Sequence, residues 1–293
     1  MLQGAVDALQ HLLQERNIQG AVSFIRTGKL GQAPTVYSFR VDNNAAVVES
    51  MEVTGGPLDQ SLFASSARRF LEQPYSRVIA REVAARELTA IYRNHGYLRA
   101  SFAEPGTEIL PATSGQTTPR VKLTFTVVPG PRYSWNHAEW RGNNVFSAAQ
   151  LSAFLGLQSG EIAAADRIEH GEEGVLEAYG STGYIQARCA PEPQYDDAAR
   201  TVTYAFNVQE GAQYRMGRLL ITGLFESAPF ADQIRAAWQL KPGDVYDATY
   251  LRKFLREDWG RIFIGARIIP KKAGATPLPD PTSLRVDVRF HAE

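Results

Sequence analysis

The sequence Tyr92-Arg93-Asn94-His95-Gly96-Tyr97 recurs 87 residues later as Tyr179-Gly180-Ser181-Thr182-Gly183-Tyr184. A second segment recurs as well, because Val121-Lys122-Leu123-Thr124-Phe125-Thr126-Val127 matches Val202-Thr203-Tyr204-Ala205-Phe206-Asn207-Val208 at an offset of 81 residues. A third copy of this alternation runs through Leu284, Val286, Val288 and Phe290. Alternation of apolar and polar residues predicts half-buried strands, and recurrence at a fixed spacing predicts a repeat protein.

Each unit is also expected to open with a strand that ends on glycine, at Gly55, Gly142 and Gly223. Glycine permits the positive φ needed to turn the chain out of a strand. Two amphipathic helical patterns follow each glycine. The clearest is the second helix of the last unit, for which Asp247 is a predicted N-cap and whose apolar stripe consists of Tyr246, Tyr250, Leu251, Phe254 and Leu255.

These patterns predict an α+β chain of tandem β-α-α-β-β repeats, each a three-stranded mixed sheet covered by two helices. We expect full repeats at 46–128, 129–210 and 211–293. Residues 1–45 are expected to hold a partial repeat, with only the second helix and the last two strands. Loops containing prolines are expected to lead to the closing strands, with Pro191 and Pro193 in one unit and Pro277, Pro279 and Pro281 in the next.

The composition argues against several classes of function. Of the 293 residues, 31 are Lys or Arg and 31 are Asp or Glu, so no net charge favours nucleic acid as a partner. The single cysteine, Cys189, excludes an intrachain disulfide and is expected to be a small core residue rather than a nucleophile. The five histidines are scattered, and His170 is expected on a solvated helix face rather than in a metal site. No catalytic residue, metal site or cofactor is predicted, so the chain is not expected to be an enzyme.

Taken together, four marks resemble the polypeptide-transport-associated (POTRA) repeat of the outer-membrane assembly and secretion superfamily, the surface antigen family. They are the strand-ending glycines, the Tyr-x3-Gly-Tyr helix exit, a Leu-x-x-Gly-Asp/Glu turn at 157–161 and 240–244, and an alternating last strand that runs into Val208-Gln209-Glu210-Gly211. Two departures affect the register: Trp259-Gly260 stands where the third unit would carry the helix exit, and Val128-Pro129-Gly130 where the first would carry Glu-Gly.

The resemblance implies a periplasmic array ahead of a C-terminal membrane β-barrel that is not in this chain. It further implies a role in outer-membrane protein assembly, with unfolded outer-membrane protein precursors as partners and accessory lipoproteins or chaperones as further ones. Two alternatives stay open: the POTRA region of a dedicated outer-membrane secretion transporter, and a periplasmic structural or division interaction module.

In this family the strand after the second helix is the expected binding edge. An exposed strand edge offers unpaired N–H and C=O groups to an extended chain, which is β-augmentation. Arg99, Arg188 and Arg267 lie in these edges, where charge also limits uncontrolled aggregation. The predicted edge residues are Leu98, Arg99, Ala100, Ser101 and Phe102; Tyr184, Ile185, Gln186, Ala187, Arg188 and Cys189; and Ile264, Gly265, Ala266, Arg267 and Ile268.

Overall fold

The structure is a computed structural model that describes residues 2–15, 21–27, 36–42, 46–111, 118–262 and 271–293. The chain divides into two compact units, Met1–Arg132 and Tyr133–Glu293. Helices accompany three mixed sheets of parallel and antiparallel strands, which confirms the predicted fold class. Among the described helices, none is both long enough and apolar enough to cross a membrane.

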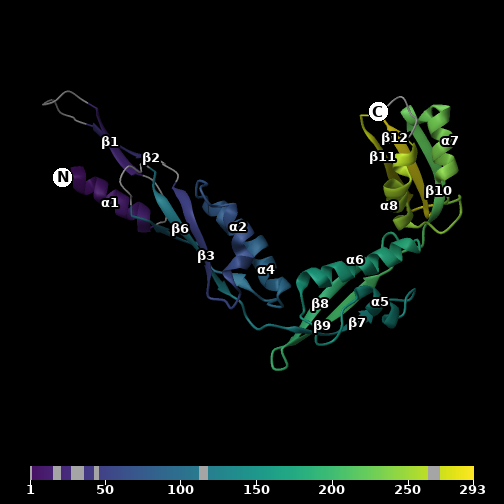
Figure 1. Ribbon diagram of the computed structural model, residues 1–293, viewed down its shortest axis with the longest axis horizontal. Coiled ribbons are helices and arrows are strands. Elements are labelled where there is room, and N and C mark those ends of the chain that lie inside the picture. Colours follow the sequence, from purple (N-terminus) through teal and green to yellow (C-terminus); the bar gives the residue numbers. More distant parts are fainter. Residues whose placement is uncertain (1, 16–20, 28–35, 43–45, 112–117, 263–270) are drawn as a thin grey trace. The chain divides into compact units, whose positions relative to one another are not determined.

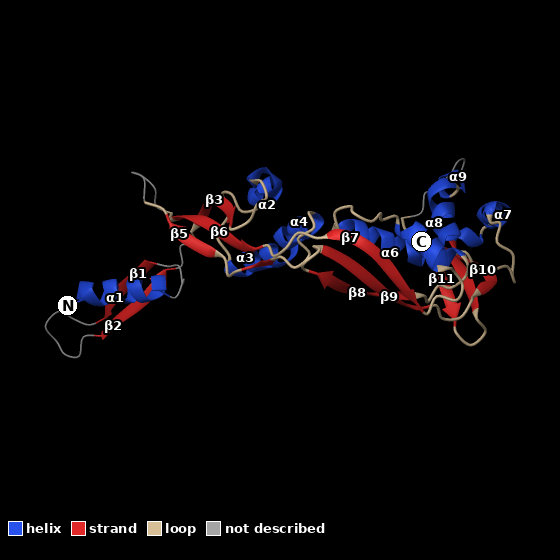
Figure 2. Cartoon of the chain, turned by 90° about the horizontal axis from the view of Figure 1, so that it is seen from below, coloured by secondary structure: helices blue, strands red, loops and turns tan. Residues whose placement is uncertain are grey.

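The second unit contains two sheets of the same design. In each, the closing strand lies in the middle, with the opening strand parallel to it on one side and the strand after the second helix antiparallel on the other. Helices lie along one face of each sheet (Figures 1 and 2). The elements are β7 (Ser134–Arg141), α5 (Ala148–Leu155), α6 (Ala165–Ser181), β8 (Arg188–Asp196), β9 (Thr201–Gln209), β10 (Arg215–Gly223), η3 (Leu224–Glu226), α7 (Ala228–Ala237), α8 (Ala248–Glu257), α9 (Trp259–Ile262), β11 (Ala273–Asp280) and β12 (Arg285–Ala292).

The first unit contains one sheet of this design and a two-stranded ribbon. The sheet has the order β3-β6-β4, with β5 also paired to β6, and the ribbon pairs β1 with β2. The elements are α1 (Leu2–Glu15), β1 (Ala21–Thr27), β2 (Val36–Asp42), β3 (Val47–Thr54), η1 (Gln60–Phe63), α2 (Ala64–Arg68), α3 (Arg77–Val83), the π-helical η2 (Ala84–Leu88), α4 (Thr89–Asn94), β4 (Ser101–Phe102), β5 (Gly106–Ile109) and β6 (Arg120–Val128).

The names first, second and third repeat are used below for 46–128, 129–210 and 211–293, whose boundaries stay predictions. The central strands of these repeats, β6, β9 and β12, carry the predicted alternation. A phenylalanine in each is fully buried: Phe125, Phe206 and Phe290. Burying such a side chain contributes roughly 1.5–3 kcal/mol, so the alternating strand anchors each core.

The Tyr-x3-Gly-Tyr segments end the second helix. The N–H of Tyr97 donates to the carbonyl of Tyr92, and the N–H of Tyr184 to that of Tyr179. The intervening glycine has φ of +86° in the first repeat and +88° in the second. Together with the bond from each glycine N–H to the residue three before it, this is a Schellman end, which satisfies otherwise unpaired carbonyls of the last helical turn.

The turn between the two helices pairs with the opening strand. In the second repeat Trp135 exchanges hydrogen bonds with this turn, donating to the carbonyl of Glu161 and accepting from the N–H of Gly160. The third repeat repeats the pattern at Met216, and the first at Val48. Glu72, with φ of +59°, stands in the first repeat where the others have glycine, so the motif survives the substitution.

Candidate polypeptide-binding edges

Each mixed sheet has an outer edge formed by the strand that follows the second helix. These edges are β4 and β5 in the first repeat, β8 in the second and β11 in the third. Within the described part of the chain these strands pair only with the central strand of their own sheet. No described strand pairs with their other side, which is where an added strand would bond.

Only part of the predicted first edge is a strand. Ser101 and Phe102 form β4, but Leu98–Ala100 lie before it. The N–H of Ala100 bonds back to the carbonyl of Tyr97, and the side chains of Leu98 and Ala100 are buried. The strand prediction for Leu98, Arg99 and Ala100 was wrong, because the chain needs this turn to pass from helix α4 to the sheet.

The predicted second edge begins too early. The N–H of Ala187 bonds to the carbonyl of Tyr184, so Tyr184, Ile185, Gln186 and Ala187 form a turn. Strand β8 starts at Arg188 and Cys189, as predicted, and runs on to Asp196. The predicted third edge, residues 264–268 from Ile264 to Ile268, lies outside the described residues; the described outer strand of the third repeat is β11.

The prolines of these regions belong to strands. Pro191 and Pro193 lie within β8, and Pro277 and Pro279 within β11, so their assignment to loops was wrong. Proline has no N–H to give to a ladder, but an edge strand tolerates it where that side faces away from the sheet. Spacing by two keeps both prolines of a strand on the same side.

The register of β11 confirms this orientation. Just before the strand, Lys272 and Glu293 each donate an N–H to the other's carbonyl, so they form a hydrogen-bonded pair. Such pairs alternate along an antiparallel ladder. Counting from Lys272, the residues that face outward are Ala273, Ala275, Pro277 and Pro279. Two of these four outward positions therefore lack a donor.

Strand β8 has the same deficit. It pairs with β9 without interruption from Arg188 to Asp196, which requires that Pro191 and Pro193 face away from β9. The outward positions are then Cys189, Pro191, Pro193 and Tyr195, and its two central ones lack a donor.

The first repeat differs, because its outward positions carry no proline. Ala103 donates to the carbonyl of Thr126 and Leu110 to that of Arg120, so these residues face β6. The alternating positions that face outward are Phe102 in β4 and Thr107 and Ile109 in β5. All three have a backbone N–H. Pro105 is buried in the short interruption between the two strands.

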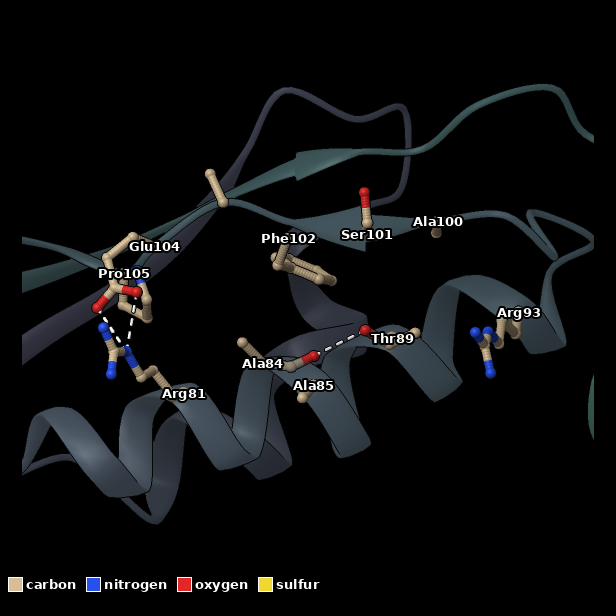
Figure 3. Close-up of a pocket in the computed structure, with 11 residues that line it drawn as sticks. Arg81, Ala84, Ala85, Thr89, Arg93, Ala100, Ser101, Phe102, Glu104 and Pro105 are labelled. Atoms are coloured by element: carbon tan, nitrogen blue, oxygen red, sulfur yellow. Dashed lines mark hydrogen bonds and ion pairs between the residues drawn. The ribbon is translucent and has the colours of Figure 1, made fainter.

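A pocket of about 360 Å³ opens beside this edge, between β4 and the second helix of the first repeat (Figure 3). The helical wall includes Ala84, Ala85 and Thr89, and Phe102 faces them from β4. The Thr89 hydroxyl donates to the carbonyl of Ala84, 2.8 Å away, within the single π-helical turn of η2. Such turns often occur at functional sites. This pocket is called the β4 groove below.

Charged side chains flank both ends of the β4 groove (Figure 3). At one end Arg77 and Arg81 each place Nε 2.7 Å from Glu104, and hydrogen bonds from Arg81 and Arg77 lower the pKa of that carboxyl. At the other end lies Arg93, which is exposed. Within the described residues its side chain makes no hydrogen bond or ion pair, so one positive charge is left uncompensated.

The β4 groove was not predicted from the sequence. The adjacent alanines Ala84 and Ala85 interrupt a stripe of larger apolar residues, which was the available signal. The expectations for Cys189 and His170 fit the structure: burial raises the pKa of the Cys189 thiol to about 12, and His170 lies exposed on α6. Among the described residues there is no cluster of three His, Cys, Asp or Glu side chains that could hold a metal.

Comparison with known proteins identifies the repeat. Residues 133–211 match the POTRA family, described as the surface antigen variable number repeat. A Treponema pallidum protein named as an outer membrane protein assembly factor is 25% identical over 77% of this chain. The outer membrane protein assembly factor BamA of Neisseria meningitidis is 24% identical over 64% of it. These matches cover 26% and 24% of the relatives, so the chain spans about a quarter of their length.

Solved structures agree on the fold. A crystal structure of POTRA3-5 of BamA from Haemophilus influenzae matches 85% of this chain and 96% of that one, with a TM-score of 0.55 and 19% identity. This match and the matches to both relatives each cover far more of the chain than residues 133–211. Residues 133–211 are therefore a POTRA repeat, and the chain is similar in sequence and fold to the POTRA regions of BamA-like outer-membrane assembly factors.

Proposed function

We propose that this chain is the periplasmic part of an outer-membrane protein assembly factor, and that it binds extended segments of unfolded outer-membrane protein precursors by β-augmentation. The observation that carries this proposal is the open outer edge of each mixed sheet. Backbone pairing is nearly independent of side-chain identity, which suits a receptor for many different precursor strands. Accessory lipoproteins or chaperones are proposed as further partners of the same repeats.

The test uses the full 293-residue chain, labelled with ²H and ¹⁵N. A nine-residue peptide of alternating apolar and polar residues, taken from an outer-membrane strand, is titrated to millimolar concentration. Amide shifts confined to outer strands of the sheets are expected. The control peptide has the same composition but proline at every second position, which removes its donors. Equal shifts with both peptides, or no shifts with either, would contradict strand addition.

A further inference from the structure

We infer that strand addition is restricted to the β4–β5 edge of the first repeat, where the added segment places an apolar side chain in the β4 groove and an acidic side chain beside Arg93. This inference rests on the proposed function and makes it specific. It names one edge among three and a chemistry for the segment that binds there.

The prolines disfavour the other two edges. An added strand bonds to outward-facing residues, and each bond that cannot form lowers the affinity by about fivefold. In β8 the two central outward positions, Pro191 and Pro193, give no bond of this kind. The remaining donors, at Cys189 and Tyr195, stand at opposite ends of the strand, so no two successive outward positions can both donate.

Strand β11 retains two successive donors, at Ala273 and Ala275. The pocket beside them is lined by Lys272, Ala273, Gly274, Thr276, His291 and Glu293, so its described lining holds no large apolar side chain. A segment bound there would gain a short backbone ladder but, among the described residues, no contact comparable to Phe102. The backbone donors alone therefore do not distinguish β11 from the β4–β5 edge. The adjoining side chains favour the β4–β5 edge.

The β4–β5 edge combines donors with apolar surface. Phe102 and Ile109 face outward through their backbones, and they pair with Val127 and Val121, whose side chains are buried in the core. Directly opposite residues share a face, so Phe102 and Ile109 lie on the helix side of the sheet, where the β4 groove opens. Ile109 is 53% exposed. The added strand can thus cover Ile109 and fill the groove with one of its own apolar side chains.

The charge of Arg93 favours an acidic residue on the face of the bound segment that points toward the groove. Glu104 is already held by Arg77 and Arg81, which leaves it no role in attracting a cation. Arg93, at the other end of the groove, has no counter-charge within the described residues. Because side chains alternate between the two faces of a strand, an acidic side chain two positions beyond the apolar one is the group that this charge favours.

Two peptides that differ only in one residue test the charge. Each has nine residues that alternate valine and threonine, with Glu in one and Lys in the other at the second position after the central valine, on the same face of the strand. At low salt Arg93→Glu is expected to weaken binding of the Glu peptide about tenfold and to strengthen binding of the Lys peptide. Arg68→Glu makes the same change on α2, away from the groove lining, and is expected to alter neither affinity. Equal affinities of wild type and Arg93→Glu for both peptides would overturn the role of Arg93.

Amide shifts of the whole chain test the edge. In the wild type we expect shifts at 101–102 and 106–110 and none at 188–196 or 273–280. The double substitution Pro191→Val with Pro193→Thr restores both donors of β8, and a second set of shifts should then emerge at 188–196. Ala85→Leu, at an exposed position in the groove, should weaken binding of the peptide to the β4–β5 edge at least fivefold relative to wild type.

The outcomes separate the inference from the function on which it rests. Wild-type shifts at 188–196 or 273–280 would overturn the inference and leave β-augmentation intact. A silent spectrum for wild type and for the proline double variant would overturn the proposed function itself. Binding at 101–110 that Ala85→Leu does not weaken would refute the groove as the site of the apolar side chain.

Discussion

Tyr133 and Tyr214 occupy the same position at the start of the opening strand in the second and third repeats, and both are buried. The hydroxyl of Tyr133 donates to Asp197, whereas the hydroxyl of Tyr214 has no partner among the described residues. The reason lies in the hairpin between the last two strands. Asp196 and Asp280 begin these hairpins in the same way, but the next residue is Asp197 in one and Pro281 in the other.

A second contrast lies at the end of the second helix. In the second repeat the hydroxyl of Tyr179 donates to Glu210, 2.9 Å away, and the same carboxylate accepts the N–H groups of Asn144 and Val145. In the third repeat Trp259 packs edge-on against Phe225, with ring centroids 5.4 Å apart. Phe146 makes the corresponding contact with Tyr179 in the second repeat, at 4.9 Å.

The two repeats therefore stabilise one backbone arrangement in two ways. The second uses buried tyrosines whose hydroxyls bond to carboxylates near the surface. The third has apolar ring packing and a buried hydroxyl that finds no partner among the described residues. A buried polar group left unpaired costs roughly 1–3 kcal/mol, so the third repeat offsets that cost with its aromatic contacts. The following substitutions test this difference.

Glu210→Ala is expected to have the largest effect, because it leaves the Tyr179 hydroxyl and two backbone N–H groups without their acceptor. We expect the second repeat to lose about 2–3 kcal/mol. Cys189, the chain's only cysteine, packs against the core of this repeat. Its labelling by 4,4′-dithiodipyridine in the native state should accelerate about 30- to 150-fold, which corresponds to that free energy. Gln209→Ala is the control. A similar acceleration of labelling in this variant would show that loss of the Glu210 carboxylate is not the cause.

Tyr133→Phe should lower the stability of its repeat, whereas Tyr214→Phe should leave the stability of its repeat unchanged or raise it. The first removes a hydrogen bond and is expected to destabilise the second repeat by about 1 kcal/mol. The second removes only an unpaired buried hydroxyl and is expected to be neutral or to stabilise the third repeat by up to about 1 kcal/mol. Amide hydrogen exchange in β9 and β12 measures each effect locally. If both substitutions destabilise equally, the hydroxyl of Tyr214 has a partner in solution.

The smallest expected effect is the loss of the stability that Glu210 contributes when the pH is lowered. Burial alone would raise the pKa of Glu210, but hydrogen bonds from Val145, Tyr179 and Asn144 hold that pKa below its ordinary value. The ionised carboxylate therefore contributes stability above the unfolded pKa of about 4.3, and this contribution is lost as the pH falls through the lower folded pKa. The labelling rates of wild type and Glu210→Gln should differ by a constant factor from pH 7 to 5 and converge as the pH falls through that lowered folded pKa. A constant difference down to pH 3 would assign the effect to geometry alone.

The sequence predicted most of the fold because its strands alternate strictly and its turns need glycine. The predicted N-cap also holds, since Asp247 accepts hydrogen bonds from the N–H groups of Thr249 and Tyr250. Strand beginnings were less predictable. A turn follows each Gly-Tyr step, and the apolar residues Leu98 and Ile185 in those turns serve a core just as strand residues would.

The outer edges were harder to predict than the cores. Proline is generally a sign of a loop, but Pro191 and Pro193 stand two residues apart, which is the spacing that a strand edge permits. The β4 groove is lined in part by Ala84 and Ala85 of the π-helical turn at Ala84–Leu88, and no simple apolar periodicity reveals such a turn. What a sequence pattern reports is burial, and an outer edge is determined by which backbone groups remain unpaired.

The turn between the helices has a consequence for how copies of the protein meet one another. In each repeat it makes three backbone hydrogen bonds to the first part of the opening strand, as at Tyr133 and Trp135. Two molecules therefore cannot join their sheets along the full length of that side. If the chain binds strand-forming clients as proposed, these bonds also keep the first part of that side from pairing with them. On the other side, prolines at outward positions remove two backbone donors from β8 and two from β11.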